Sequence, residues 1–335
     1  MIPHRGKHFR NNKEPGSSAG NKKKILTALL LMVMAALVVF LMLSAGGGKR
    51  PSAPQESPLS ADLKEASPDK ALSGDIKSGD VKSETPVSGD VTKKPDKDGK
   101  TDEKHKPLLA VIVDDGGSDT ALAKRLAALR LPLTWAVLPY QKNSTVFAEL
   151  ALDSQIPFLC HLPMQAVSDT ESSQYIIGVG MPYGEVMKKT ARALDSLPGA
   201  IGINNHRGSR ATEDRTLMEP VMEELKKRAL IFVDSRTSKE SRAYGTALDA
   251  SIPALKNNLF LDNRPDKAEI KKRLNEAVQL ARKNGSAVVI CHFRPVTVEF
   301  LEELSQNYKK LPVKIVTVPE LLLIKKMSEQ MEEAL

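Results

Sequence analysis

Residues that bind metals or transfer protons follow several short apolar segments of this sequence. They are Asp114 and Asp115 after VIV, His161 after FLC, His206 after GIN, Asp234 at the end of IFVD and His292 after VVIC. One carboxylate and two imidazoles, with a position left open, form the ligand set of a catalytic zinc or a related divalent ion. Such an ion activates water and polarises a carbonyl oxygen, while a second carboxylate and a further imidazole can act as base and acid. The pattern points to metal-assisted hydrolysis.

Each of these residues also has a simpler structural interpretation. An Asp after a strand often caps the next helix, a role that Ser118 or Asp119 could equally fill, and a lone His is often a buried structural residue. Arg207, Arg210, Asp234 and Arg236 could be surface or loop-closing residues. If the strand ends face one common mouth, however, so many ionisable groups would be costly to bury unless they serve a metal or a reaction. We therefore favour a functional rim.

Alternation along a strand predicts where the neighbours of these residues point. Asp114 and Asp115 should face opposite sides, but Gly116 and Gly117 permit a sharp turn that would bring both carboxylates to the rim. Cys160 and Cys291 each precede a histidine of the set, so their thiols should point away from the mouth. We expect two free, buried cysteines rather than a disulfide.

The elements that must position these residues follow an alternating β and α pattern after Pro107. The predicted strands begin at Leu108, Leu133, Pro157, Ala200, Leu230, Asn258, Ala287 and Val313. Amphipathic helical stretches separate most of them, which is typical of βα units around a parallel sheet. Residues 107–325 are therefore predicted to form a distorted seven- or eight-stranded (β/α) barrel, with an open doubly wound sheet as the alternative. No GxGxxG or Walker loop follows the first strand, which argues against nucleotide binding.

The N-terminal third has a different organisation. Residues 25–43 are apolar apart from Thr27 and long enough to cross a bilayer as a helix. This helix is predicted to anchor the protein in the inner (plasma) membrane. The basic segment 1–24 predicts that the N-terminus stays in the cytoplasm and that the chain after the helix is exported. The alternative is a cleaved signal peptide with a site near Ala45. Residues 44–106, rich in Pro, Gly, Ser, Lys and Asp, are predicted to be a disordered linker, and residues 326–335 a helical tail.

Charge and cysteine content exclude other classes. Seven basic residues and one acidic residue before residue 25 account for +6 of the net charge of +8. The remaining chain is nearly neutral, so nucleic-acid binding is not expected. Two cysteines exclude a disulfide scaffold and a four-thiolate zinc module. No protein partner can be inferred.

Five ordered motifs resemble the polysaccharide deacetylases, and most closely their divergent branch. They are VDDGG at Val113, HLPMQ at His161, NNHRGSR at Asn204, VDSRTS at Val233 and GSAVVICH at Gly285. The resemblance covers most of Pro107 to about Lys325. It implies a deacetylase-type barrel and a metal-dependent amidohydrolase whose cofactor is a divalent metal ion, with Zn²⁺ expected.

The resemblance also implies roles for individual residues. Asp114 corresponds to the catalytic base, Asp115 and His161 to metal ligands, and His292 to the general acid. The family's usual second histidine lies four residues after the first, where this chain has Gln165. We therefore assign the third ligand to His206. Further substrate or supporting residues are Arg207 or Arg210 beside the base, Asp234 beside the acid, and the segment containing Ser209, with Arg236 nearby.

These features predict a membrane-anchored, metal-dependent enzyme that removes N-acetyl groups from an envelope polysaccharide, either a GlcNAc-type polymer or peptidoglycan. The alternative is a non-catalytic envelope protein that binds metal and glycan on the same fold. A metal phosphoesterase is a weaker third hypothesis, because that class commonly needs more carboxylate and histidine ligands than this rim supplies.

Overall fold

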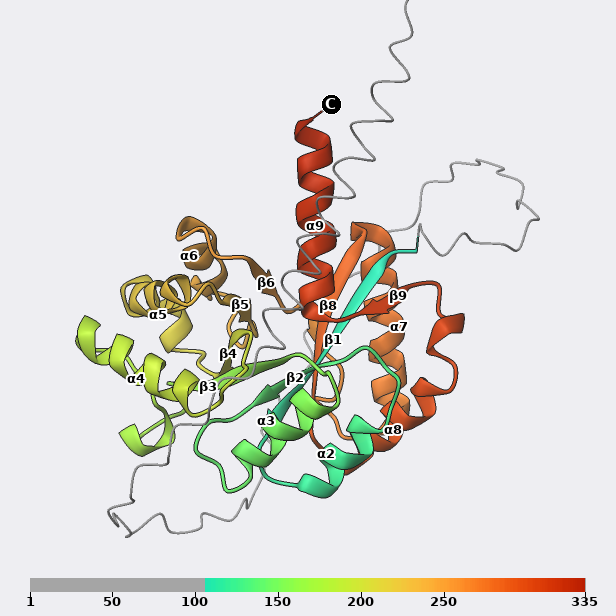
Figure 1. The fold of residues 1–335 in the computed structure, drawn as a ribbon, viewed down its shortest axis with the longest axis horizontal. Coiled ribbons are helices and arrows are strands. Elements are labelled where there is room, and N and C mark those ends of the chain that lie inside the picture. Colours follow the sequence, from blue (N-terminus) through green and yellow to red (C-terminus); the bar gives the residue numbers. More distant parts are fainter. Residues whose placement is uncertain (1–105, 335) are drawn as a thin grey trace, which may run out of the picture. The chain divides into compact units, whose positions relative to one another are not determined.

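Short apolar and β-branched segments form a parallel sheet in the computed structural model, which describes residues 106–334 (Figure 1). The strands are β1 (Leu108–Gly116), β2 (Thr134–Val137), β3 (Phe158–Met164), β4 (Gly202–Arg207), β5 (Ile231–Asp234), β6 (Ala254–Lys256), β7 (Leu259–Phe260), β8 (Ser286–His292) and β9 (Lys314–Val316). The α-helices are α2 (Thr120–Ala127), α3 (Ser144–Asp153), α4 (Tyr183–Asp195), α5 (Arg215–Lys227), α6 (Ala243–Asp249), α7 (Lys267–Asn284), α8 (Pro295–Ser305) and α9 (Val318–Glu333). Three 3₁₀ turns are η2 (Ser172–Gln174), η3 (Ala211–Glu213) and η4 (Tyr308–Lys310).

The strand order is that of a barrel that has not closed. It runs β6-β5-β4-β3-β2-β1-β8-β7, so strands that follow one another in the chain lie side by side from β1 to β6, and β8 returns to β1. Within the described residues no pairing joins β6 to β7. The predicted parallel α/β architecture is confirmed, but the sheet is curled and open. The doubly wound alternative is wrong, because that fold requires a reversal of strand order beside the first strand.

Strand β9 adds a ninth member that shares one edge of β1 with β2. It pairs with Leu108 to Ala110, whereas β2 pairs with the second half of β1. All eight predicted strands are present. The sequence analysis missed the additional strand β6, because it has only three residues and directly follows Pro253, a residue type that is typical of turns.

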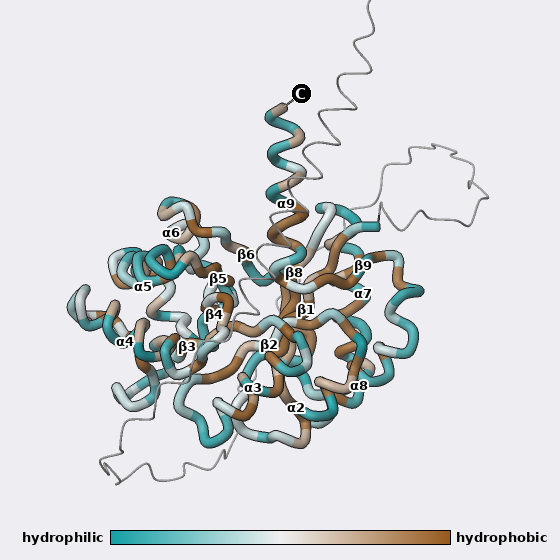
Figure 2. The backbone as a smooth tube through the Cα atoms, in the orientation of Figure 1, coloured by the Kyte–Doolittle hydropathy of each residue, from teal (hydrophilic) through white to brown (hydrophobic). Residues whose placement is uncertain are grey.

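The two faces of the sheet are buried by different partners. Leu109, Val111 and Val113 point outward into a cluster shared with α2 to α8. Ala110 and Ile112 point inward, where they meet residues of the other strands and of α9. Figure 2 shows the resulting hydrophobic centre, with more polar helix surfaces around it. Because neighbouring residues alternate between these faces, the inner face is the one that can present side chains to a central site.

Helix α9 closes the interior at the amino ends of the strands. Its first turn is capped by Thr317, which accepts a hydrogen bond from Glu320 N–H and whose own N–H is bound by the Glu320 side chain. Val318 and Leu321 are fully buried in the inner cluster. The Val318 N–H donates to Thr134 Oγ1 at 3.0 Å, so the helix start is tied to β2. The opposite, carboxyl end of the interior is therefore the end available for a site.

The predictions for the N-terminal part fall outside the described residues. This applies to the cytoplasmic segment 1–24, the anchor 25–43 and the linker 44–106 except for its last residue. Among residues 106–334, no helix combines the length and hydrophobicity needed to cross a membrane. The predicted domain boundaries stay predictions, and α9 continues through residue 325 as one helix.

The role of α9 as a plug predicts a stability effect. Leu321→Ala should lower the free energy of unfolding by about 2–5 kcal/mol, because it removes buried methyl groups and leaves a cavity between the sheet and the helix. Leu152→Ala, in which the wild-type side chain is 52% exposed on α3, is the matched control and should change it by less than about 0.5 kcal/mol. Urea unfolding of the full chain measures both. Equal effects of the two substitutions would contradict the plug.

Candidate functional site

The carboxyl ends of β1, β3, β4 and β8 bring the predicted site residues together on the inner face. Asp114 lies in register with His292, and His161 lies in register with Asn204. The sequence predicted that His161 and His206 come just after their strands. In the structure they are instead part of β3 and β4. The apolar runs were therefore shorter than the strands, because polar residues continue the strand backbone where they face the site.

The two adjacent carboxylates reach the same region because the backbone is irregular at Asp115. Asp115 has a left-handed φ of 66°, and the β1–β2 register shifts between Val113 and Gly116. Such a bulge changes the direction in which a side chain points. The expectation that Gly116 and Gly117 provide this turn was partly misplaced, since the deviation begins at Asp115. A non-glycine residue in this conformation is strained, which is common at functional sites.

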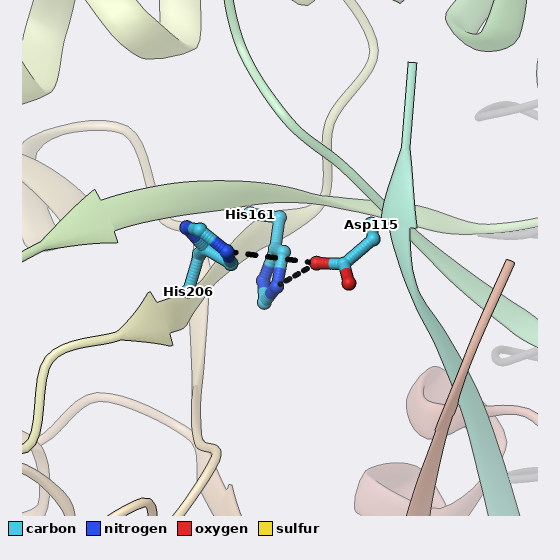
Figure 3. Close-up of side chains that lie close together, drawn as sticks. All are labelled: Asp115, His161 and His206. Carbon is cyan, nitrogen blue, oxygen red and sulfur yellow. Dashed lines mark ion pairs between the residues drawn. The ribbon is translucent and has the colours of Figure 1, made fainter. Parts of the chain in front are cut away.

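Asp115, His161 and His206 form a three-residue cluster that can hold a metal ion (Figure 3). One potential ligand atom from each residue lies within 4.8 Å of the others. Asp115 Oδ1 is 3.3 Å from His161 Nε2 and 3.7 Å from His206 Nε2. The side chains of Asp115 and His206 are 36% and 28% exposed, so solvent reaches one side of the cluster. This set of one carboxylate and two imidazoles leaves positions open for water or substrate.

The chemistry of these residues suits a cation. Asp115 Oδ1 and His206 Nδ1 are buried without a hydrogen-bond partner. Burial opposes charge on Asp115, but the imidazole of His161, whose Nε2 lies 3.3 Å from Asp115 Oδ1, outweighs it and holds the pKa of Asp115 well below its usual range. Burial and the charge of His161 lower the pKa of His206 to about 3. The site therefore offers an ionised carboxylate and a neutral imidazole, the forms that bind divalent metals.

Asn204 connects the metal cluster to Asp114. This fully buried side chain donates from Nδ2 to Asp114 Oδ1 at 2.9 Å, and its Oδ1 lies 2.9 Å from His161 Nδ1. An amide oxygen only accepts, so His161 carries a proton on Nδ1, and in its neutral form the ring therefore keeps its lone pair on Nε2, toward the cluster. Asn204 lies in the NNHRGSR motif, yet its role was not predicted, although it lies two residues before His206 and therefore shares the inward face of the strand.

Asp114 is the buried carboxylate of the site. Burial raises its pKa, against the opposing effects of the His161 and His292 charges. Its second oxygen, Oδ2, lies 3.5 Å from His161 Nε2. A carboxylate with a raised pKa next to a metal cluster has the properties of a general base. Asp119, and not Asp114 or Asp115, caps α2, so both carboxylates are free of that structural role.

The partner of His292 is Asp262, which the sequence analysis missed. His292 Nδ1 lies 2.7 Å from Asp262 Oδ1, while Asp262 Oδ2 accepts from the His292 N–H and from Thr297 Oγ1. Burial disfavours charge on the imidazole, but the hydrogen bond and charge of Asp262 outweigh it and raise the pKa of His292. Phe260 stacks on the ring. Asp262 ends the predicted strand NLFLD, so its position after a strand was a usable signal.

The prediction that Asp234 supports His292 is therefore wrong. Asp234 faces the outer layer, where its carboxylate accepts from Ser241 Oγ and from the N–H groups of Arg236 and Tyr244. The Arg236 guanidinium donates to the carbonyls of Lys239 and Ser241. Both residues close the loop before α6, which was their simpler structural interpretation. Asp234 follows Val233, an inward residue, so strand alternation turns it away from the site.

The predicted pairing of an arginine with Asp114 is also wrong. Arg207 forms an ion pair with Asp169 and donates to Ser168 Oγ at 3.2 Å. Arg210 is exposed, and its N–H donates to the carbonyl of Gln165. Asn204 lies beside Asp114 because it is on the inner face of β4. The backbone changes direction at Arg207, which has a φ of 55° and ends the strand.

Gln165 and Ser209 hold the loop that borders the site. Gln165 Oε1 accepts from the Val179 N–H, and Ser209 Oγ accepts from the Val167 N–H. Gln165, which occupies the position of the family's usual second histidine, therefore braces this loop. The predicted free cysteines are confirmed, since Cys160 and Cys291 are buried in the outer cluster.

The geometry around His292 predicts the effect of removing its partner. Asp262→Asn should lower the pKa of His292, because the neutral amide no longer stabilises the imidazolium. Asp266→Asn, which removes an exposed carboxylate at the start of α7, should leave this pKa unchanged. An NMR titration of the His292 ring protons measures both. An unchanged pKa in Asp262→Asn would show that the pair does not control the charge of His292.

Comparisons with known proteins find one matching family and two related sequences. The model of the divergent polysaccharide deacetylase family matches residues 111–322. The uncharacterised protein YibQ of Escherichia coli K12 is 32% identical over 199 residues, which are 59% of this chain and 62% of YibQ. An uncharacterised protein of Haemophilus influenzae is also 32% identical over 199 residues, 59% of this chain and 71% of that protein.

A solved structure shares the fold. The crystal structure of an uncharacterised protein from Agrobacterium tumefaciens C58 matches with a TM-score of 0.61 and 20% identity, and covers 65% of this chain and 89% of that one. The family match includes the segments that carry Asp114, His161, His206 and His292 and nearly the whole described sheet. This chain belongs to the divergent polysaccharide deacetylase family.

Proposed function

We propose that the protein is a metal-dependent hydrolase that removes N-acetyl groups from an envelope polysaccharide. The observation that carries this proposal is the cluster of Asp115, His161 and His206 beside two groups suited to proton transfer, Asp114 and His292. A divalent ion, most reasonably Zn²⁺, would be held by the three cluster residues and would supply an activated water and a polarised amide carbonyl. The partly exposed cluster leaves room for a substrate.

Asp114 is assigned as the general base. Its buried carboxylate has a raised pKa, and Asn204 orients one of its oxygens. The other oxygen can accept the proton of the attacking water. Unlike an arginine, the neutral amide of Asn204 orients the carboxylate without placing a positive charge beside it, so it favours the ionised base less strongly than a cation would.

His292 is assigned as the general acid that protonates the departing amine. Asp262 accepts from Nδ1, which leaves Nε2 as the nitrogen that can give a proton to the substrate. The stacked ring of Phe260 and the three hydrogen bonds on Asp262 restrict the orientation of the imidazole. Base and acid lie on neighbouring strands, as Asp114 and His292 are in register. The two side chains therefore lie next to each other on the inner face, where both can reach one bound substrate amide.

The substrate class and the cellular location extend this proposal. Membership of the polysaccharide deacetylase family supports a GlcNAc-type polymer or peptidoglycan as substrate. The apolar segment 25–43 and the basic residues before it support an inner-membrane anchor with the described domain on the outer side. The polar linker would let the domain reach substrate away from the membrane.

A non-catalytic role in binding metal and glycan is the second candidate. Gln165 replaces the usual second histidine, and the base has an asparagine neighbour in place of an arginine. Both candidates predict metal binding, so only turnover separates them.

The role of Asn204 predicts a change in metal affinity. Asn204→Leu should weaken zinc binding by about 10–100-fold, because it removes the acceptor that keeps the His161 proton on Nδ1. Asn204→Asp retains an acceptor for the His161 proton, so its zinc affinity should stay closer to that of the wild type. Asn257→Leu is the matched control, since this buried asparagine bonds only to the loop around Ser235 and Leu259. Competition with a chromogenic chelator measures affinity, and wild-type affinity in Asn204→Leu would contradict the assignment.

The proposed activity predicts acetate release from chitooligosaccharides or peptidoglycan fragments. Release should stop after treatment with a chelator and return with Zn²⁺ or another divalent ion. Asp114→Asn should reduce turnover by about 100-fold or more while zinc binding persists, because only the base is lost. Metal-bound wild-type protein that binds these glycans without releasing acetate would instead support the non-catalytic alternative.

A further inference from the structure

Three aromatic side chains pack behind the backbone that carries Asp114 and Asp115. Trp135 of β2 and Phe147 of α3 are fully buried, and Phe293 directly follows the end of β8. The ring centroid of Phe293 lies 5.2 Å from that of Trp135 and 5.1 Å from that of Phe147, in both cases edge to face. We call these three residues the aromatic cluster. They pack with the outer side of the sheet, whereas the site residues lie on its inner face.

Gly116 is the point at which the aromatic cluster meets the bulge of β1. A Cβ atom on Gly116 would lie 3.0 Å from Phe147 Cδ1, 3.2 Å from Phe293 Cε2 and 3.1 Å from the Ala136 carbonyl oxygen. These distances are tighter than ordinary van der Waals contacts, so only a residue without Cβ lets both rings come this close to the backbone. The φ of Gly116 lies outside the left-handed region. The structure therefore requires the missing side chain of this glycine, and not its backbone freedom.

Hydrogen bonds hold the backbone on both sides of Asp115. The Phe293 N–H donates to the Asp114 carbonyl at 2.9 Å, and the Leu138 N–H donates to the Gly116 carbonyl at 2.8 Å. A strained residue such as Asp115, at φ 66°, persists only where the surrounding structure holds it. Phe293 contacts the bulge twice, through its N–H at Asp114 and through its ring at Gly116.

We propose that Phe293 is a positioning residue that keeps the Asp115 carboxylate within reach of His161 and His206. Without its ring, the packing on one side of Gly116 is lost, and the backbone at Asp115 can relax from its left-handed conformation. The carboxylate would then turn away from the two imidazoles. This positioning role rests on the metal site of the proposed function, and it adds to that site a residue that provides no ligand atom.

The same residue relates the bulge to the proposed acid. Phe293 directly follows His292, and His292 lies in register with Asp114 on the neighbouring strand. The two contacts of Phe293 with β1 therefore fix where the end of β8 lies relative to the bulge. Because protein interiors are closely packed, a change in one ring shifts the atoms that it touches. A change at Phe293 should thus alter the geometry of the metal residues while it leaves every ligand in place.

Metal binding by the full chain tests this proposal. Phe293→Leu should weaken zinc binding by about tenfold, because the shell around a metal site orients its ligands. It should also change the visible absorption spectrum of the cobalt-loaded protein, which depends on the ligand geometry. Phe300→Leu is the matched control, since this buried ring of α8 belongs to the outer core but not to the aromatic cluster. It removes the same atoms from the core and should leave zinc affinity and the cobalt spectrum unchanged.

The close approach at Gly116 provides a second test that keeps all three rings. Gly116→Ala should also weaken zinc binding and change the cobalt spectrum, because the added Cβ meets Phe147 and Phe293. Gly184→Ala is the control, since a Cβ at that position on α4 would meet no side chain and no neighbouring element within 4 Å. This control should retain both the affinity and the spectrum of the wild type.

The possible results separate the positioning role from the proposed function. A wild-type chain that binds neither Zn²⁺ nor Co²⁺ would overturn both. If the wild type binds metal, and Phe293→Leu affects affinity and spectrum no more than Phe300→Leu does, the positioning role alone is wrong. If Phe293→Leu does not fold, Gly116→Ala decides the question, and wild-type affinity in that variant would overturn the proposal.

Discussion

Two adjacent carboxylates at one end of a buried sheet face impose the main constraint on this structure. A buried charge is costly unless other groups pair with it or bond to it. Asp115 has His161 and His206 beside it, while Asp114 has Asn204 and lies near the charges of His161 and His292. The surrounding strands therefore supply imidazoles and an amide at the positions where an ordinary sheet would continue its apolar core.

This constraint explains why residues at different positions along the strands have different roles. The inner face is apolar at its amino end, where α9 plugs it, and polar at its carboxyl end. Residues of the outer face hold the loops: Asn205 bonds to the Arg207 carbonyl and the Ser235 N–H, and Asp234 holds the start of α6. Asn205, which lies between the inward residues Asn204 and His206, thus fixes the backbone around them. Strand alternation produces both roles from one short motif.

Local sequence was sufficient to predict the architecture of the domain and most residues of the site. The eight predicted strands exist, because apolar runs of this length separated by amphipathic helices have few other arrangements. Asp115, His161 and His206 come together as predicted, since the carboxyl ends of neighbouring parallel strands lie at one edge. The strand ends were less reliable, because polar residues that face a site look like loop residues in the sequence. Asp262 was missed although it ends a predicted strand, because local sequence does not show that this strand lies beside β8, which carries His292.

The sequence by itself determined the parallel βα order, the chemical types of the ligands and the free, buried state of the cysteines, since all of these follow from composition and local spacing. Tertiary structure decided which side chains meet. The bulge at Asp115 brings two neighbouring carboxylates to one site, the inward face of β4 places Asn204 beside Asp114, and the pairing of β7 with β8 places Asp262 beside His292. The physical reason is that the direction of a side chain depends on backbone dihedrals and on the pairing of distant strands, neither of which is encoded by a residue and its near neighbours alone.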